Sequence, residues 1–358
     1  MKYKFEDIAI NSTAKKLPEP SDNEHYIGLE HLDSGNLYVT RWGADTAPIG
    51  EKLLMKKGDV LFGKRRAYQK KVGIAPFDGI FSAHGMVLRP KEDVICKEFF
   101  PFFISSDYFL NEAIRISVGG LSPTINWKDL RVLEFELPSL EEQRVLADKL
   151  WAAYEVKESY KNLLAQTDKL LHAQFEKMFG DPNNSYNEQE LFDYDDVCFD
   201  DTKSATKIPE NTFLKEGKYP IYSQGKDSEI AYTNIDDGLC NKIPVVLFGD
   251  HTREFKLIKE PFYIGADGVK LIRPKEGIQY DVEFLYYLLR YRDIPNTGYN
   301  RHYKWVKLFR LPVPPMKKQL EFVSIAEQAE RTKASLNKGI EAIEAVIRSL
   351  IAEGTTKV

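Results

Sequence analysis

The stretch 58–71, GDVLFGKRRAYQKK, contains residue types that bind phosphate. It begins with the pattern G-x-x-x-x-G-K, which is the front of the loop that cradles nucleotide phosphates. That loop also needs Ser or Thr after the lysine to hold magnesium, and small residues between the glycines so that backbone N–H groups can converge. Arg65 occupies the hydroxyl position, and the run 60–62, Val-Leu-Phe, is typical of a buried strand. The sequence therefore favours a strand followed by a cationic turn over a nucleotide-binding loop.

The cations of this turn suit contact with DNA. Arginine donates two hydrogen bonds to guanine, and lysine contacts phosphate. The expected DNA-binding residues of the turn are Lys64, Arg65, Arg66, Tyr68, Lys70 and Lys71. A solvated hairpin tip is the alternative interpretation of the same residues.

Two loops, 119–128 and 297–305, combine glycine and asparagine with polar and aromatic side chains. Gly and Asn permit tight backbone turns. The DNA-binding residues expected in the first loop are Ser122, Thr124 and Asn126, and those expected in the second half of the chain are His251, Arg253, Tyr299, Asn300, Arg301, His302 and Lys304. The alternative is a turn with core aromatics, which suits Trp127 and Trp305 better than it suits the basic residues.

Charge is segregated along the chain. The formal net charge of −4 does not by itself indicate a nucleic-acid binder. The span 56–71 nevertheless contains seven cations and one acid, Asp59, and the span 290–310 contains six cations and one acid, Asp293. Acidic residues gather elsewhere, at Asp193, Asp195, Asp196, Asp200 and Asp201. Because local charge sets the field that a phosphate backbone meets, this pattern favours DNA binding.

Length and composition predict a globular protein of two or three domains, with 358 residues and 43% apolar content. The chain has no apolar run of 18 residues and no long apolar N-terminal segment, so a cytoplasmic protein is expected. Cys96, Cys198 and Cys240 are odd in number, which suits a reducing compartment. They are too far apart for a C-x-x-C pair, and the six histidines form no H-x-x-x-H pair, so no metal site is predicted.

The elements that must position these residues occur twice. VLFG stands at 60–63 and again at 246–249, and LRPKE at 88–92 corresponds to IRPKE at 272–276. LPSLEEQ at 137–143 and LPVPPMKKQ at 311–319 each introduce a helical pattern. The intervals from Leu137 to Gly180 and from Leu311 to Gly354 are both 43 residues long. The chain is therefore expected to contain two copies of a globular unit followed by a long helix. In the second copy Asp250 occupies the position that Lys64 has in the first.

The two helical patterns carry apolar seams with steps of three and four residues, which indicates coiled-coil packing. The first helix is expected to begin at a capping box, Ser139 and Glu142, and to end before Gly180. Its seam is Leu146, Leu150, Ala153, Tyr160, Leu164, Leu171 and Met178, interrupted by Lys157, Thr167 and Gln174. The second seam is Phe322, Ile325, Ala329, Leu336, Ile340, Ile343, Ile347 and Leu350, interrupted by Thr332. Equal length and phase favour antiparallel pairing of the helices, and packing of each helix on its own domain is the alternative.

The sequence lacks three catalytic motifs that an enzyme acting on DNA or esters would carry. The sequence has no G-x-S-x-G, no Asn/Asp-Pro-Pro-aromatic tetrapeptide of the amino methyltransferases, and no glycine-rich motif for S-adenosylmethionine. These absences favour a binding protein over an enzyme.

The order and duplication of these motifs resemble the specificity subunit of type I restriction-modification systems. The similar stretches are LPSLEEQ at 137–143, MFGDP at 178–182, GADGVK at 265–270 and YNRHYK at 299–304. One departure is Lys318, which replaces the usual acid before Gln319, so the second helix is expected to dock its partner differently.

The resemblance implies an α+β fold with two globular α/β target recognition domains in pseudo-twofold duplication, separated by two long α-helices that pair as an antiparallel coiled coil. The expected segments are recognition domains at 1–136 and 181–310, and spacer helices at 137–180 and 311–358. The implied function is sequence-specific recognition of double-stranded DNA with a bipartite target, each domain reading one half and the helices setting the gap.

The implied partners are two modification (methyltransferase) subunits, which dock on the helices, and restriction (translocase and nuclease) subunits. The resemblance implies S-adenosylmethionine, ATP and Mg²⁺ for those partners. It implies no cofactor, metal or catalytic residue for this chain. Two alternatives remain open: a diverged DNA methyltransferase with its own recognition domains, and a two-lobed protein-binding scaffold.

Overall fold

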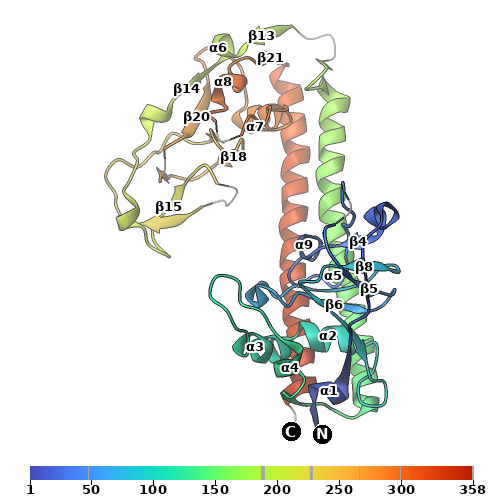
Figure 1. The fold of residues 1–358 in the computed structure, drawn as a ribbon. Coiled ribbons are helices and arrows are strands. Elements are labelled where there is room, and N and C mark those ends of the chain that lie inside the picture. The colour runs from blue at the N-terminus through green and yellow to red at the C-terminus, as the bar shows by residue number, and fades with distance from the viewer. Residues whose placement is uncertain (47, 187–189, 226–228, 266, 299, 357–358) are drawn as a thin grey trace. The chain divides into compact units, whose positions relative to one another are not determined.

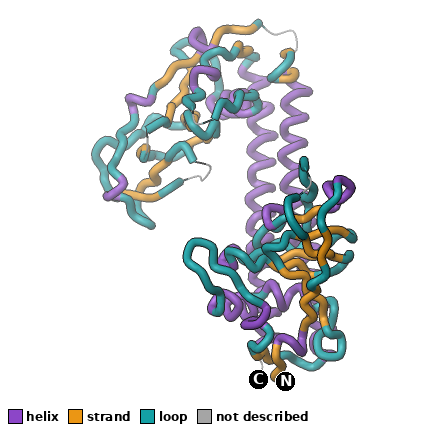
Figure 2. The backbone as a smooth tube through the Cα atoms, viewed as in Figure 1, coloured by secondary structure: helices purple, strands orange, loops and turns teal. Residues whose placement is uncertain are grey.

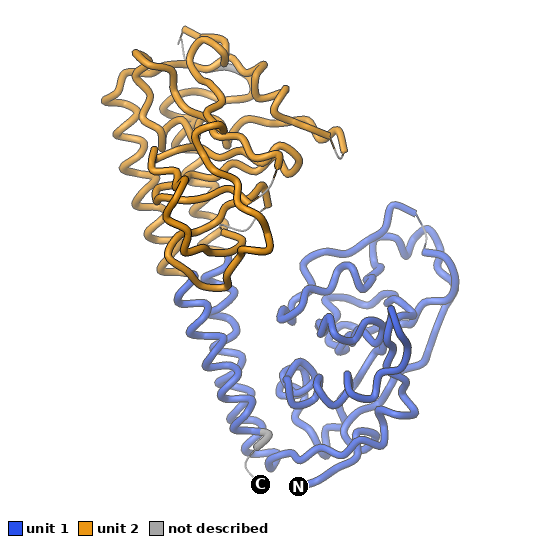
Figure 3. Tube along the Cα trace, turned by 90° about the vertical axis from the view of Figure 1, so that its left-hand side faces the viewer, with its two compact units in different colours: residues 1–161, 337–358 blue, residues 162–336 orange. Residues whose placement is uncertain are grey.

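The computed structural model describes residues 1–46, 48–186, 190–225, 229–265, 267–298 and 300–356. The chain divides into two compact units, shown in Figure 3. Unit 1 contains residues 1–161 and 337–358, and unit 2 contains residues 162–336. The two long helices, α5 (Leu140–Phe179) and α9 (Met316–Thr356), each begin in one unit and end in the other.

Unit 1 contains two four-stranded sheets. The first has the order β2-β9-β6-β7 and is antiparallel throughout, and the second has the order β3-β5-β8-β4. The strands are β2 (Ala9–Ser12), β3 (Lys15–Lys16), β4 (Tyr26–Ile27), β5 (Lys52–Met55), β6 (Val60–Phe62), β7 (Val72–Ile74), β8 (Gly79–Phe81) and β9 (Met86–Pro90). β1 (Lys2–Lys4) pairs with β10 (Glu134–Glu136), and the short helices are α1 (Phe5–Ile8), α2 (Phe100–Ser105), α3 (Asp107–Arg115) and α4 (Trp127–Leu130).

Unit 2 repeats the first sheet in the same order, β14-β20-β17-β18. Its strands are β14 (Cys198–Asp200), β17 (Val245–Gly249), β18 (Phe255–Ile258) and β20 (Val269–Pro274). A three-stranded sheet has the order β16-β15-β19, with β15 (Tyr219–Tyr222), β16 (Ala231–Thr233) and β19 (Tyr263–Ile264). The remaining elements are β11 (Gly180–Asp181), β12 (Ser185–Tyr186), β13 (Leu191–Asp193), α6 (Tyr194–Val197), α7 (Val282–Arg290), α8 (Tyr303–Val306) and β21 (Arg310–Pro312).

The repeated VLFG phrases form equivalent strands. β6 and β17 both lie between a hairpin partner and a third strand, and their apolar side chains are buried. The pairing of β1 with β10 in unit 1 corresponds to the pairing of β13 with β21 in unit 2. The predicted duplication is therefore present in the sheet topology as well as in the sequence.

The long helices begin and end close to where the sequence predicts. The Ser139 hydroxyl accepts from Glu142 N at 3.3 Å, and Glu142 Oε2 accepts from Ser139 N at 2.9 Å, which completes the capping box. The helix α5 ends before Gly180, whose φ of 93° lies in the left-handed region that favours glycine. The second helix begins at Met316, because residues 310–312 form β21.

Within each unit α5 and α9 lie side by side, as Figure 1 shows. In unit 1 the glycine Gly339 lies against the Tyr160 ring, and Gly354 lies against Leu146, so the start of α5 is beside the end of α9. In unit 2 Lys333 Nζ lies 2.9 Å from Asp168 Oδ1. The pairing is antiparallel, as predicted.

Each long helix also packs on the globular parts of the two units. Helix pairing and packing of the helices on the domains, which the sequence left as alternatives, therefore both occur. Leu146, Leu150 and Tyr154 belong to the core of unit 1, and Ile347 packs against that core. In unit 2 both Phe175 and Phe322 are fully buried, and so are other residues of both helices. Figure 2 shows the strands and loops of the globular parts against the two long helices.

A buried glutamine fixes the first turn of each long helix to the globular part before it. Gln143 Oε1 accepts from Cys96 N at 2.7 Å, and its amide nitrogen donates to Val94 O and Pro138 O. Gln319 makes the same set of bonds with Asp281 N, Gln279 O and Pro314 O. Both glutamines are fully buried, whereas the neighbouring Lys318 is exposed. The departure at Lys318 therefore leaves this attachment unchanged.

Candidate nucleic-acid interface

The cationic stretch of unit 1 is the turn that joins β6 to β7. Gly63 N donates to Lys71 O at 2.9 Å and closes the turn. Arg66 and Lys70 have φ angles of 53° and 49°, and they flank a three-residue 3₁₀ turn, Ala67–Gln69. A nucleotide-binding loop leads into the N-terminus of a long helix. The short turn after Gly63 confirms that this sequence is not such a loop.

This turn is bonded to the loop 119–128. Arg66 N donates to Pro123 O at 2.8 Å, and Ile125 N donates to Lys64 O at 3.0 Å. Arg65 and Thr124 form an isolated antiparallel bridge. The structure therefore brings Lys64, Arg65 and Arg66 together with Ser122, Thr124 and Asn126, although more than fifty residues separate the two segments.

The exposed side chains of the turn are Arg65, Arg66 and Tyr68, and 56% of Tyr68 is exposed. Arg65 Nη1 lies 3.2 Å from His84 Nε2, a residue that the sequence did not single out. Partial burial and the charges of Arg65 and Lys64 lower the pKa of His84. A neutral His84 ring accepts a hydrogen bond from Arg65 and so orients the guanidinium.

Lys64, Lys70 and Lys71 are half-buried. Burial, together with the charge of Lys15, lowers the pKa of Lys64. Lys70 Nζ lies 2.5 Å from Asp107 Oδ1, and Lys71 Nζ donates to Leu29 O at 2.6 Å. Lys70 and Lys71 therefore hold the turn on its own domain, while the two arginines face outward.

In unit 2 the turn after β17 is pinned in the corresponding way. Asp250 is buried, its Oδ1 accepts from Tyr303 N at 2.6 Å, and its carbonyl accepts from His302 N at 2.8 Å. The carboxylate that replaces Lys64 thus points inward and caps the start of α8. It does not face the surface on which a phosphate would lie.

The other predicted residues of unit 2 divide into buried and exposed groups. The His302 ring is fully buried, with Nδ1 3.0 Å from Asp250 O, so it shapes the loop from within. His251 Nδ1 lies 3.1 Å from Asn300 O, and Arg253 Nη1 donates to Ile294 O at 3.2 Å. Asn300, Arg301 and Lys304 are exposed, and Tyr299, like Ala266, lies outside the described residues.

The two tryptophans after these loops are partly buried. Trp127 packs edge-on against Phe5, with ring centroids 5.6 Å apart. Lys304 Nζ lies 5.5 Å from the centre of the Trp305 ring. Trp127 is therefore a core aromatic residue after a turn, as the alternative interpretation expects. Trp305 in addition makes a cation–π contact with the exposed Lys304.

Over the part of the chain that the structure describes, His, Cys, Asp and Glu side chains form no cluster of three or more that could hold a metal ion. Cys96, Cys198 and Cys240 are buried free thiols. None of the described helices is long and apolar enough to cross a membrane.

The fold and these surfaces define a class of protein: a duplicated recognition protein in which each unit pairs a strand-connecting turn with the loop before a short helix. The chain belongs to the family described as type I restriction modification DNA specificity domain, whose model matches residues 5–166 and 187–345. The two matches correspond to the two copies seen in the sheets.

Known proteins resemble the chain in sequence and in fold. The type I restriction enzyme EcoDI specificity subunit of Escherichia coli is 27% identical over 182 residues, which are 49% of this chain and 40% of that protein. The S subunit of a type I restriction-modification system from M. genitalium has a TM-score of 0.61 at 14% identity, over 99% of this chain and 96% of that one. A chain solved in a study of complex assembly and conformational transition of the type I R-M system has a TM-score of 0.55 at 17% identity, over 99% of this chain and 97% of that one. These two structures share the fold.

Proposed function

We propose that the chain is the DNA-recognition subunit of a type I restriction-modification complex and that each globular part reads one half of a bipartite target. The observation that carries this proposal is the equivalent construction of the two turns, after β6 and after β17, within a chain of two specificity domains. A site built once in each copy suits a target with two parts.

In unit 1 the exposed Arg65 and Arg66 are the candidates for contact with base edges, because arginine pairs its two donors with guanine. In unit 2 Arg301 and Lys304 take that place. The buried residues His302 and Asp250 fix the loop that presents them.

The proposed domain limits are 1–136 and 181–310 for recognition and 137–180 and 311–358 for the spacers. Exchange of residues 1–136 for those of another specificity protein should change one half-site and leave the other half-site and the gap intact. A change in both half-sites would show that these limits do not separate two recognition functions.

The helices are the proposed docking surface for two modification subunits. Each unit exposes apolar side chains on its helices: Val145, Val156 and Val346 in unit 1, and Leu163, Leu170 and Leu320 in unit 2. Apolar side chains in such positions suit the packing of helices from a partner. The name of the E. coli relative, a restriction enzyme subunit, supports assembly with restriction subunits as well.

The chain contributes recognition and no catalytic group in this proposal. S-adenosylmethionine, ATP and Mg²⁺ then belong to the partner subunits, and the complex works in the cytoplasm, where its DNA target lies. Ultraviolet crosslinking of labelled S-adenosylmethionine to the assembled complex should mark the modification subunit. Labelling of this chain would instead favour a diverged methyltransferase.

The deciding experiment is methylome sequencing of cells that express this chain with its modification subunit. We expect one methylated motif made of two short half-sites separated by a gap of fixed length. A continuous motif, or methylation that does not depend on this chain, would contradict the proposal.

A further inference from the structure

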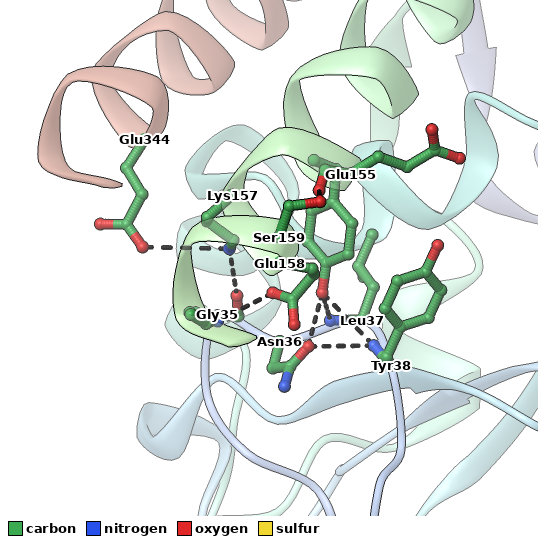
Figure 4. Close-up of polar contacts among 11 residues, drawn as sticks. Gly35, Asn36, Leu37, Tyr38, Glu155, Lys157, Glu158, Ser159 and Glu344 are labelled. Carbon is green, nitrogen blue, oxygen red and sulfur yellow. Dashed lines mark hydrogen bonds and ion pairs between the residues drawn. The ribbon is translucent and has the colours of Figure 1, made fainter. Parts of the chain in front are cut away.

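The helix α5 is bonded to a loop of unit 1 at residues 35–38. The Tyr154 hydroxyl accepts from Leu37 N at 2.6 Å and from Tyr38 N at 3.3 Å, and it donates to Asn36 Oδ1 at 2.5 Å. One turn further along, Lys157 Nζ donates to Gly35 O at 3.1 Å (Figure 4). We call these contacts of Tyr154 and Lys157 with residues 35–38 the latch.

The two latch side chains are held in place by burial and charge. Only 4% of Lys157 and 2% of Tyr154 is exposed. Lys157 Nζ lies 4.6 Å from the centre of the Tyr154 ring and 3.9 Å from Glu344 Oε1 on α9. A buried ammonium group is stable only with such partners, so movement of the loop away from α5 costs free energy.

The latch connects the helix to the cationic turn. Leu37 O accepts from Ile74 N at 2.9 Å, and Tyr38 forms a parallel bridge with the same residue. Ile74 belongs to β7, and β7 is the strand that leaves the turn bearing Arg65 and Arg66. A continuous path of hydrogen bonds therefore runs from α5 through residues 35–38 to the turn.

The attachment at this end of unit 1 combines the polar bonds of the latch with ring contacts of Tyr154 to Tyr38 and Phe102. A cavity of about 760 Å³ opens beside the latch, and its lining includes Leu37, Val72, Tyr154, Lys157 and Ile347. The other attachment that we described, Gln143, lies fourteen residues earlier on α5, or about 21 Å away along the helix. The core contacts of Leu146 and Leu150 and the bond from Trp151 Nε1 to Glu98 O lie between these two attachments. A pivot of the globular part about Gln143 therefore displaces the latch more than it displaces these nearer contacts.

We propose that Tyr154 and Lys157 are positioning residues that hold the DNA-reading turn of unit 1 at one angle on α5 and thereby restrict the gap lengths that the protein accepts. This inference rests on the proposed function. A target whose gap is one base pair too long or too short is read only if the domain pivots. Pivoting breaks the latch, so the free energy of the latch is added to the cost of every incorrect gap.

The repeat supplies a matched control. Lys333 lies 176 residues after Lys157, the same offset that separates Gln143 from Gln319. Its ammonium group lies 2.9 Å from Asp168 on α5 and 2.7 Å from Glu330 on α9. Lys333→Met therefore removes a cation at the equivalent helix position and breaks contacts that run between helix residues.

The test is a methylation assay of the assembled methyltransferase on DNA with fixed half-sites and gaps up to two base pairs shorter or longer than the preferred one. For Lys157→Met and Tyr154→Phe we expect methylation at gaps wrong by one base pair to rise about tenfold relative to the preferred gap, the size expected for one hydrogen bond from a charged or buried donor. The half-site bases should not change. Lys157→Arg, which keeps a charged donor, and Lys333→Met should both keep the wild-type gap profile.

A second measurement reports the latch without DNA. Amide hydrogen exchange at Leu37 and Tyr38 should be faster in Tyr154→Phe than in the wild type, even if Lys157→Met fails to fold. The proposal would be overturned if folded latch variants kept the wild-type gap profile. It would also be overturned if Lys333→Met raised methylation at incorrect gaps as much as the latch variants do. If the wild type itself methylates no bipartite site, the proposed function fails, and the exchange rates then decide separately whether the latch exists.

Discussion

At the scale of single residues, the two units use different chemistry at equivalent positions. After Gly63 the chain presents Arg65 and Arg66 at the surface, whereas after Gly249 it buries Asp250 beneath α8. The loop that partners this turn in unit 2 carries the exposed cations Arg301 and Lys304. Equivalent frameworks with different exposed side chains are what two different half-sites require.

The first prediction concerns the arginines. Arg65→Ala or Arg66→Ala should weaken recognition of one half-site by about 1–3 kcal/mol if the lost contact is a bidentate bond to a base. Methylation of substrates with single base changes measures this loss. Arg301→Ala is the matched variant and should affect the other half-site, whereas a phosphate contact would weaken all sequences alike. Disturbance of the same bases by variants in both units would contradict the one-unit-per-half-site model.

The second prediction concerns the reactivity of the buried thiols below their raised pKa values. Burial raises the pKa of Cys198 to about 12 and also raises the pKa of Cys96. The thiolate is the reactive form, so a raised pKa keeps these residues protonated and unreactive at neutral pH. Titration with a thiol reagent at pH 8 should label the native protein slowly and the urea-unfolded protein fast. Fast labelling of the native protein at Cys198 would show that this core opens readily.

Residue types and spacing predicted the cationic turn but not which of its side chains face outward. Lys70 and Lys71 are partnered by Asp107 and Leu29, and His302 is buried against Asp250. These partners lie far away in the sequence, so burial at such positions depends on the fold. His84 was missed for the same reason, because only the sheet brings it beside Arg65.

At the scale of elements, the helices were the most predictable part of the chain. The capping box at Ser139 and the glycine at 180 act locally, and both helix ends therefore follow from sequence. Periodicity was less reliable for burial, since the expected seams leave out Tyr154, Phe175 and Phe179, which the structure buries. Lys157 interrupts the apolar seam in the sequence, yet the structure buries it against Gly35 O, because a lysine stem packs like an apolar chain when its ammonium group finds a carbonyl.

The third prediction concerns the buried glutamines. Gln143→Leu should destabilise unit 1 by about 2–4 kcal/mol, because the buried Cys96 N and the part-buried Val94 O both lose their hydrogen-bond partner. Gln319→Leu should act likewise on unit 2. Urea unfolding followed by tryptophan fluorescence measures the change. The control is Lys318→Leu, an exposed neighbour whose substitution should change stability by less than about 0.5 kcal/mol. Equal effects at 318 and 319 would argue against the glutamine as the anchor.

At the scale of the whole molecule, duplication explains the organisation. Both the repeated sequence phrases and the repeated sheet order place one strand-connecting turn and one helix attachment in each unit. This level was predictable because the repeat is visible in the sequence itself. The hydrogen bonds that join each turn to its partner loop were not predictable, because they link residues that are far apart in the sequence and share no local pattern.

The fourth prediction concerns the proposed spacer. Insertion of seven residues into each helix, after Lys161 in α5 and after Leu336 in α9, keeps the apolar seams in register. Each helix then lengthens by about 10 Å, which corresponds to roughly three base pairs. A methylation assay on a gap library should show a longer preferred gap and unchanged half-sites, with some loss of activity because the added base pairs also rotate one half-site around the duplex. An unchanged gap preference would mean that the helices do not measure distance.

The return of α9 to unit 1 has a consequence for the order of events during synthesis. The core of unit 1 includes contacts from Ile347, Leu350 and Ile351, which the ribosome adds only after residues 162–336. Residues 162–336 are translated in between, which takes about 10–35 s at the usual elongation rate. During that time the part of the apolar core near Leu146 and Leu150 lacks the contacts that α9 later makes with it. A nascent chain at this stage is a natural client for chaperones, and a chain that stops before residue 337 would present an uncovered apolar surface to the cell's proteases.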